Sequence, residues 1–186
     1  MHIEDAQRDV RTTYAGGFHG QLVSGLLWLA AAAVSVWASP SAGIVTLLLG
    51  GMLIFPLTTL VLRISGRPAS LPAGHPMNAL AMQIAFTVPL GLLVAVAASG
   101  YRQDWFFPAA MVVVGAHYLP FVFLYGMPLF AVLAALLSFG GVGLALWFSG
   151  PFSLGGWITG AVLVGFAFVL RSAAGQGVEK AQSARR

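Results

Sequence analysis

The chain has 186 residues, of which 59% are hydrophobic and 8% are charged. Soluble domains carry about 25% charged residues, so this composition excludes an ordinary soluble domain and predicts an integral membrane protein. The net charge of +4 comes from loops and tails and does not indicate nucleic acid binding, while the absence of cysteine excludes disulfides and thiolate chemistry.

The first segment, residues 1–17, is polar and charged. Glu4 and Arg8 are four residues apart, which is the spacing of an ion pair on a short surface helix. Gly16 and Gly17 follow, and they give the chain conformational freedom just before the membrane. We therefore expect a cytoplasmic N-terminal segment that ends where the membrane domain begins.

Six apolar stretches follow, each close to the ~20 residues that a membrane-spanning helix needs. Residues 105–148 are apolar almost throughout and fit two helices with a break at Gly126. The sequence predicts an all-α bundle of six transmembrane helices within residues 18–171, followed by a basic cytoplasmic tail at 172–186. The predicted spans are 18–38, 43–63, 77–99, 105–125, 127–148 and 154–171.

The basic residues are distributed unevenly between the two sides of the predicted bundle. Eight of the nine Lys and Arg lie in the N-terminal segment, the loop after the second span and the tail, and only Arg102 lies on the other side. Because short cytoplasmic loops are enriched in Lys and Arg, both termini are predicted to be cytoplasmic. Four tryptophans then lie near the outer interface, which indole rings favour: Trp37, Trp105, Trp147 and Trp157.

Polar side chains occur mainly in the cytoplasmic half of the predicted spans. At ~1.5 Å per helical residue, His117 lies ~12 Å from the cytoplasmic end of its span. On the same basis, Gln83, Thr59 and Gln21 lie ~9, ~6 and ~5 Å deep. Polar groups that face lipid are penalised, so we expect these side chains to face inward and to meet one another.

Two functional interpretations of this polar layer remain open, and a third is less favoured. In the first, the protein is a small transporter or ligand-binding protein with a pocket that opens to the cytoplasm and takes a small solute. In the second, it is a structural or accessory subunit that binds a partner protein, and Gln83 and His117 are only hydrogen-bonded packing contacts. The third is a membrane enzyme with His117 as a base, and the sequence assigns no catalytic residue. The predicted ligand-binding residues are His117, Tyr118, Gln83, Asn78, Gln21 and Thr59.

Prolines and small residues indicate how the helices would bend and approach. Pro56, Pro89 and Pro120 lie inside spans, where each removes a helix hydrogen bond, so we expect kinks that shape the pocket. Small residues spaced by four, such as Gly20 with Ser24, allow close helix packing. Packing within one chain and a homodimer through these faces are both open alternatives.

The histidines do not indicate a metal or haem site. No two of the four lie three or four residues apart, and no carboxylate lies inside a span. Zinc sites need several nitrogen, sulfur or oxygen ligands at one point, so we expect no metal and no cofactor. The lipid bilayer is the one partner that the composition itself predicts.

Three stretches resemble a known family. GGMLIFPLTTLVLR (50–63), HPMNALAMQIAFTVPL (75–90) and VVVGAHYLPFVFLYGM (112–127) are similar to segments of an uncharacterised family of small bacterial multi-span inner-membrane proteins of unknown function. The resemblance covers roughly residues 1–170. It implies a multi-pass protein of the bacterial inner (plasma) membrane, and it implies no activity, ligand or catalytic residue.

Overall fold

A computed structural model describes residues 2–148 and 150–183, with side chains for residues 2–148 and 150–175. These residues form helices and loops without any strand, which confirms the predicted all-α fold. Six helices are long and apolar enough to cross a membrane. A shorter helix, α1 (Ile3–Thr13), precedes them. The six are α2 (Phe18–Trp37), α3 (Pro40–Ile64), α4 (Met77–Tyr101), α5 (Phe106–Tyr125), α6 (Leu129–Trp147) and α7 (Leu154–Ser183).

The helix ends follow from local turn chemistry. Ser39 precedes α3, and its hydroxyl accepts a hydrogen bond from the Ala42 N–H at 3.1 Å, while Pro40 occupies the first helical position. Gly126 adopts φ +61°, a left-handed conformation that ends α5, so the break predicted there is a full turn. Helix α7 continues past the predicted boundary at Arg171 to Ser183. Residues 184–186 of the predicted tail lie outside the described residues.

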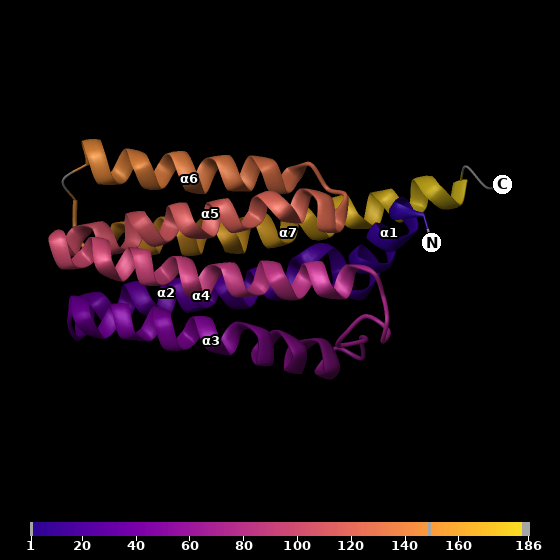
Figure 1. Cartoon of the computed structure of the whole chain (residues 1–186), viewed down its shortest axis with the longest axis horizontal. Helices are drawn as coiled ribbons and strands as arrows, with labels where there is room; N and C mark the ends of the chain where they lie inside the picture. The colour runs from indigo at the N-terminus through magenta and orange to yellow at the C-terminus, as the bar shows by residue number, and fades with distance from the viewer. Residues whose placement is uncertain (1, 149, 184–186) are drawn as a thin grey trace.

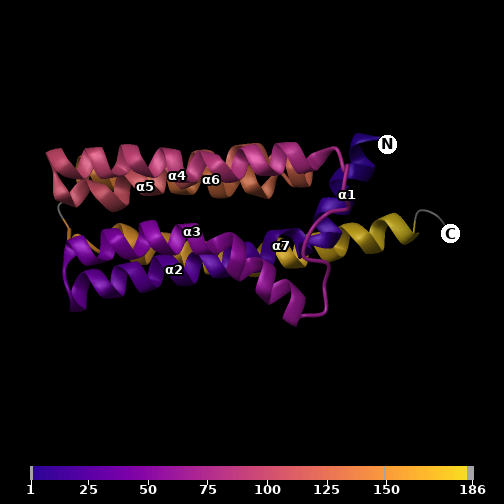
Figure 2. The ribbon, with the colours of Figure 1, turned by 60° about the horizontal axis from the view of Figure 1, so that its bottom comes forward.

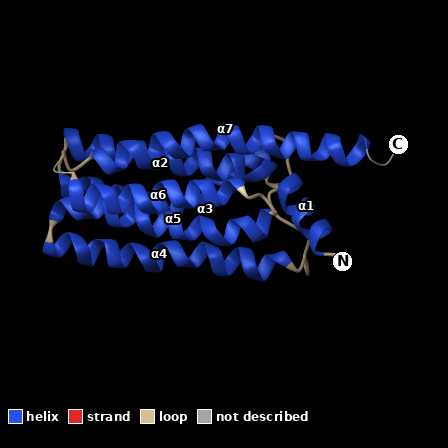
Figure 3. Cartoon of the chain, turned by 90° about the horizontal axis from the view of Figure 1, so that it is seen from above, coloured by secondary structure: helices blue, strands red, loops and turns tan. Residues whose placement is uncertain are grey.

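The membrane helices form two layers of three. Figure 2 shows α4, α5 and α6 in one layer and α2, α3 and α7 in the other. Within the layers, α5 packs against both α4 and α6, and α2 packs against both α3 and α7. Seen from above, the helices run side by side along the long axis of the bundle (Figure 3). By contrast, α3 and α4 make few contacts, and Figure 2 shows α3 bending away from α4 in the half that contains Pro56.

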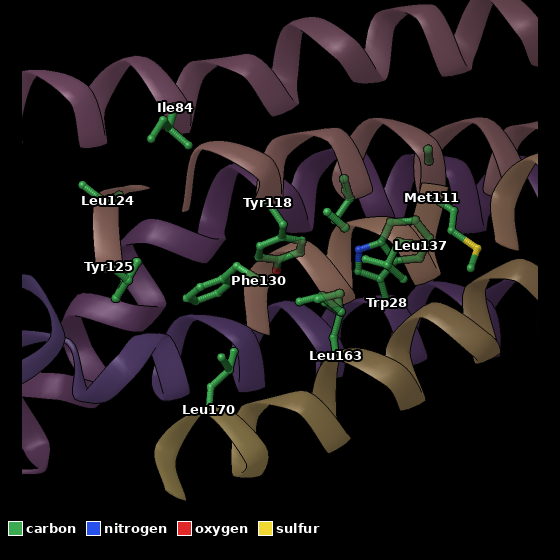
Figure 4. Packing of buried hydrophobic residues seen from close by; sticks show 14 of the residues in the cluster. Trp28, Ile84, Met111, Tyr118, Leu124, Tyr125, Phe130, Leu137, Leu163 and Leu170 are labelled. Carbon is green, nitrogen blue, oxygen red and sulfur yellow. The ribbon is translucent and has the colours of Figure 1, made fainter. Parts of the chain in front are cut away.

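Bulky side chains fill the space between the layers. Phe106, Phe107 and Phe130 are completely buried, and the Trp28 ring lies 5.9 Å from the Phe107 ring. Figure 4 shows Tyr118 of α5 beside Phe130 of α6, with side chains of α2 and α7 nearby. Because lipid chains are as apolar as these residues, close packing rather than water exclusion holds the helices together.

Helix α1 lies across one end of the bundle, near the end of α7 (Figure 1). It buries Ala6 and Val10 against the membrane domain. The Gln7 side chain donates a hydrogen bond to the Phe123 carbonyl (2.6 Å), and the Arg11 guanidinium donates to the Tyr125 carbonyl (2.5 Å). Since the last carbonyls of a helix lack partners within it, α1 caps the end of α5. We call this end, with the 65–76 loop, Gly126 and the last turns of α7, the arginine-rich end.

Candidate functional site

His117 joins two helices of one layer. Its Nδ1 atom lies 3.1 Å from the Thr87 hydroxyl of α4. That hydroxyl donates its one proton to the Ile84 carbonyl at 2.7 Å, and the same carbonyl is within reach of the imidazole. The imidazole of His117 is thus bonded to α4 through Nδ1, which donates or accepts according to the ring tautomer. The ring packs against Tyr118 and Phe121, with centroid distances of 5.5 and 4.9 Å.

Gln83 does not meet His117, contrary to the expected hydrogen bond. Its side chain is exposed on the surface of α4. The packed face of α4 contains Ile84 and Leu92. At 100° per residue, a side chain one position before Ile84 points well away from that face. Thr87 lies one turn after Gln83 on the same flank of α4, and its hydroxyl, not the Gln83 amide, lies at the level of the His117 imidazole.

Gln21 lies in the buried centre of the bundle. Only 3% of the residue is exposed, and neither atom of its side-chain amide has a hydrogen-bond partner among the described residues. Ser24, one turn along α2, lies against the Tyr118 hydroxyl of α5. Gly17, one turn in the other direction, lies next to the rings of Phe130 and Tyr125. Gln21 lies between these two levels of α2.

We call these polar side chains, which come from three helices, the polar row. The row begins at Gln21 and Ser24 on α2, continues through Tyr118 and His117 on α5, and ends at Thr87 on α4. It contains no residue with a permanent charge. The row can therefore offer hydrogen-bond donors and acceptors to an uncharged group, and His117 can accept a proton.

Two predicted site residues lie elsewhere. Asn78 donates from its side chain to the Pro72 carbonyl at 2.9 Å, so it fastens the 65–76 loop to the start of α4. Thr59 is half-buried on α3. The hydroxyl of the neighbouring Thr58 is buried and has no hydrogen-bond partner among the described residues. The Thr58 side chain lies close to Gly20 of α2. The structure brings neither Asn78 nor Thr59 into the polar row.

Two hollows of the surface lie away from His117. A depression of about 460 Å³ lies on α7 at the arginine-rich end, lined by Phe168, Val169, Ser172 and Ala173. Another, of about 20 Å³, lies at the opposite end near Asp104 and Phe148. Within the described residues, no three His, Asp or Glu side chains come together as metal ligands. The polar row runs from buried Gln21 on α2 to exposed Thr87 on α4, with His117 half-buried between the helices.

Helix α1 and the 65–76 loop cover the arginine-rich end of the polar row. The His75 imidazole accepts a hydrogen bond from the Met77 N–H (3.2 Å), and its other nitrogen lies 3.5 Å from the Asp9 carboxylate. Burial lowers the pKa of Arg11, and nearby Arg8 adds to that effect. Burial raises the pKa of Tyr14, and the Leu71 backbone partly offsets this. The last turn of α1 is therefore partly withdrawn from water and fixed against the loop.

Comparison with known proteins gives one informative match. Residues 3–173 match the model of a family described as a family of unknown function (DUF7010). No curated protein matches the chain. No solved structure matches it either. The match covers α1 and nearly all of the membrane domain, and this agrees with the resemblance to an uncharacterised family of multi-span proteins.

Proposed function

We propose that this chain, which belongs to the DUF7010 family, is an integral membrane protein that binds a small uncharged solute at the polar row. The buried amide of Gln21 carries the proposal. An unpartnered buried polar group costs about 1–3 kcal/mol, and such groups in native proteins usually contact a water molecule or a ligand. A primary amide presents two donors and an acceptor, so it suits a hydroxyl, carbonyl or amide group of a solute.

The rest of the polar row supports the same chemistry. Ser24, three residues after Gln21, and Tyr118 contribute two hydroxyls, and His117 contributes an imidazole. No charged side chain lies in the row to pair with an ionic ligand, and burying an unpaired ion would cost several kcal/mol. The solute class that fits is therefore polar and neutral, such as a polyol, a nucleoside or a primary amide.

We further propose that the protein lies in a bacterial inner membrane with the arginine-rich end in the cytoplasm. The uneven distribution of Lys and Arg supports this orientation. A solute would then reach the polar row from the cytoplasmic side, past α1 and the 65–76 loop. Transport would require a second opening at the other end, and binding alone requires only this one.

The test is thermal unfolding of the full chain in detergent, with a panel of polyols, nucleosides and primary amides. A compound that binds raises the unfolding midpoint, since it stabilises only the folded state. Gln21→Leu should raise the midpoint of the free protein, because it removes the unpartnered amide, and it should abolish the shift produced by the compound. Ser35 lies on the same helix at the opposite end, so the Ser35→Ala variant should still show the rise in unfolding midpoint when the compound is added. A full shift in the Gln21→Leu variant would refute the assignment.

An accessory subunit is the second candidate, and exposed Gln83 favours it. A primary amide exposed on the surface of α4 finds no partner in lipid but could bind a helix of another protein. A photo-crosslinking residue at position 83 should then yield a defined adduct in native membranes. The same group in place of Phe139, which is 77% exposed on α6, serves as the lipid-facing control. Equal labelling at both positions would count against this candidate.

A further inference from the structure

Three basic side chains from separate segments converge at the arginine-rich end. They are Arg171 of α7, His19 of α2 and Arg67 of the loop after α3. The Arg171 guanidinium carbon lies 4.8 Å above the Phe18 ring, and the Phe18 and His19 rings are 5.0 Å apart. Both guanidinium groups are close enough to His19 to act on its charge. We call these three residues the basic cluster.

The basic cluster lacks a neutralising carboxylate among the described side chains. Among the described side chains, Asp5 pairs with Arg8, Asp9 lies beside the His75 imidazole, and Asp104 pairs with Arg102 at the opposite end of the bundle. Arg67 donates one hydrogen bond to the Thr12 carbonyl at 3.1 Å, which leaves most of its N–H groups available. Bringing like charges together is unfavourable, so this arrangement would be stabilised by an anion bound among them.

The cluster lies at the level where lipid headgroups meet the protein. His19 is the second residue of α2, Arg67 follows closely after the end of α3 at Ile64, and Arg171 lies in the last turns of the span Leu154–Gly175. Figure 1 shows these helix ends at the same end of the bundle. Basic groups between transmembrane helices at this depth are suited to phospholipid headgroups.

Apolar surface next to the cluster favours a lipid over a soluble anion. Phe168, whose ring lies 5.3 Å from the Phe18 ring, is 54% exposed, and Val169 is 47% exposed. The depression of about 460 Å³ lies on the same turns of α7, and both residues line it. An acyl chain could cover this surface while its phosphate contacts the cluster.

We propose that Arg67, Arg171 and His19 bind the phosphate group of an anionic phospholipid. The guanidinium groups match phosphate oxygens in charge and in hydrogen-bond geometry. The His19 imidazole lies beside both guanidinium groups, and its Nδ1 atom has no hydrogen-bond partner among the described residues. The site is independent of the polar row, and its failure would leave the proposed solute binding untouched.

The experiment is native mass spectrometry of the full chain in neutral detergent with phosphatidylglycerol, and phosphatidylcholine as the neutral comparison. Wild-type protein should retain a phosphatidylglycerol adduct. The Arg67→Gln/Arg171→Gln variant should bind it about 30-fold more weakly, at about a factor of five for each arginine. Arg63→Gln removes an exposed arginine of the same end outside the cluster and should behave as wild type.

Three results would overturn the proposal. Unchanged binding in the double variant would place the lipid elsewhere, and an equal loss in Arg63→Gln would show only general attraction to a charged surface. Inorganic phosphate that binds as tightly as phosphatidylglycerol would identify a soluble anion as the ligand. If the glutamine variant fails to fold, Arg67→Lys/Arg171→Lys keeps the charge and loses the paired N–H geometry. It should bind measurably more weakly than wild type, and wild-type affinity would count against the site.

Discussion

At the scale of single residues, close helix contacts depend on the absence of side chains at a few positions. A Cβ at Gly43 of α3 would lie 2.8 Å from the Ala31 carbonyl and would overlap the Ser35 hydroxyl of α2. At Gly165 of α7, by contrast, no atom lies within 4 Å of the same position. The small-residue spacing in the sequence predicted close packing in general, and it did not include Gly43. It could not separate these two glycines, because that depends on where the neighbouring helix lies.

We therefore expect opposite results from the same substitution at these two glycines. Gly43→Ala should destabilise the protein by about 2 kcal/mol, because backbone atoms of α2 would have to move. Gly165→Ala should be neutral or stabilising by up to about 1 kcal/mol, because alanine favours a helix. Thermal unfolding in detergent, followed by circular dichroism, measures both. Similar midpoints for the two variants would contradict the close α2–α3 contact.

At the scale of elements, the sequence predicted helix α1 but not its position. The charge spacing predicted a short helix, and α1 confirms it, although Arg8 pairs with Asp5 and not with Glu4. What the sequence did not show is that α1 folds back onto the end of α5. The fold-back needs consecutive left-handed residues, and Ala15, Gly16 and Gly17 have φ of +49°, +66° and +88°. Glycine permits this easily, whereas Ala15 does so at a cost.

Ala15→Gly should consequently stabilise the protein by about 1 kcal/mol, because it relieves the left-handed strain at the start of the turn. Ala30 lies in the regular part of α2 and is exposed. Ala30→Gly should destabilise by about 1 kcal/mol, because glycine weakens a helix interior. Unfolding midpoints of the two variants in one detergent provide the comparison. A loss of stability in Ala15→Gly would argue against the turn that positions α1.

The contact of α1 with α5 can be tested separately. Arg11→Met should destabilise by about 1–2 kcal/mol, because it removes a charged donor from the terminal carbonyl of Tyr125. Arg8→Met should cost less than about 0.5 kcal/mol, since its partner Asp5 lies on the same partly exposed helix. Hydrogen exchange of the last turn of α5 should also accelerate in the Arg11 variant alone. Equal effects of the two substitutions would mean that α1 does not cap α5.

At the scale of the whole molecule, hydropathy and length predicted six spans, and the structure has six such helices. The assignment of helices to layers could not be predicted, because lipid is as apolar as the protein core and the two faces of a span look alike in sequence. Met52 and Leu90 are 71% and 66% exposed although they are as apolar as buried residues. The estimated depth placed Gln83 beside His117, whereas Thr87, one turn further along the same flank of α4, lies there.

The orientation of the bundle in the membrane bears on both proposals, because the solute entry and the lipid site both lie at the arginine-rich end. The chain contains no cysteine, so single-cysteine variants can be labelled without background. Ser70 lies in the loop at the arginine-rich end, and Gln103 lies at the opposite end; both are exposed. In intact bacterial cells, a membrane-impermeant maleimide should label Gln103→Cys and should label Ser70→Cys only after the cells are broken. The reverse pattern would place the arginine-rich end outside, against the distribution of positive charge. It would also move the basic cluster to the other leaflet. The lipid experiment, which is done in detergent, would still measure phosphate binding. Solute entry from the cytoplasm by way of α1 would no longer be possible.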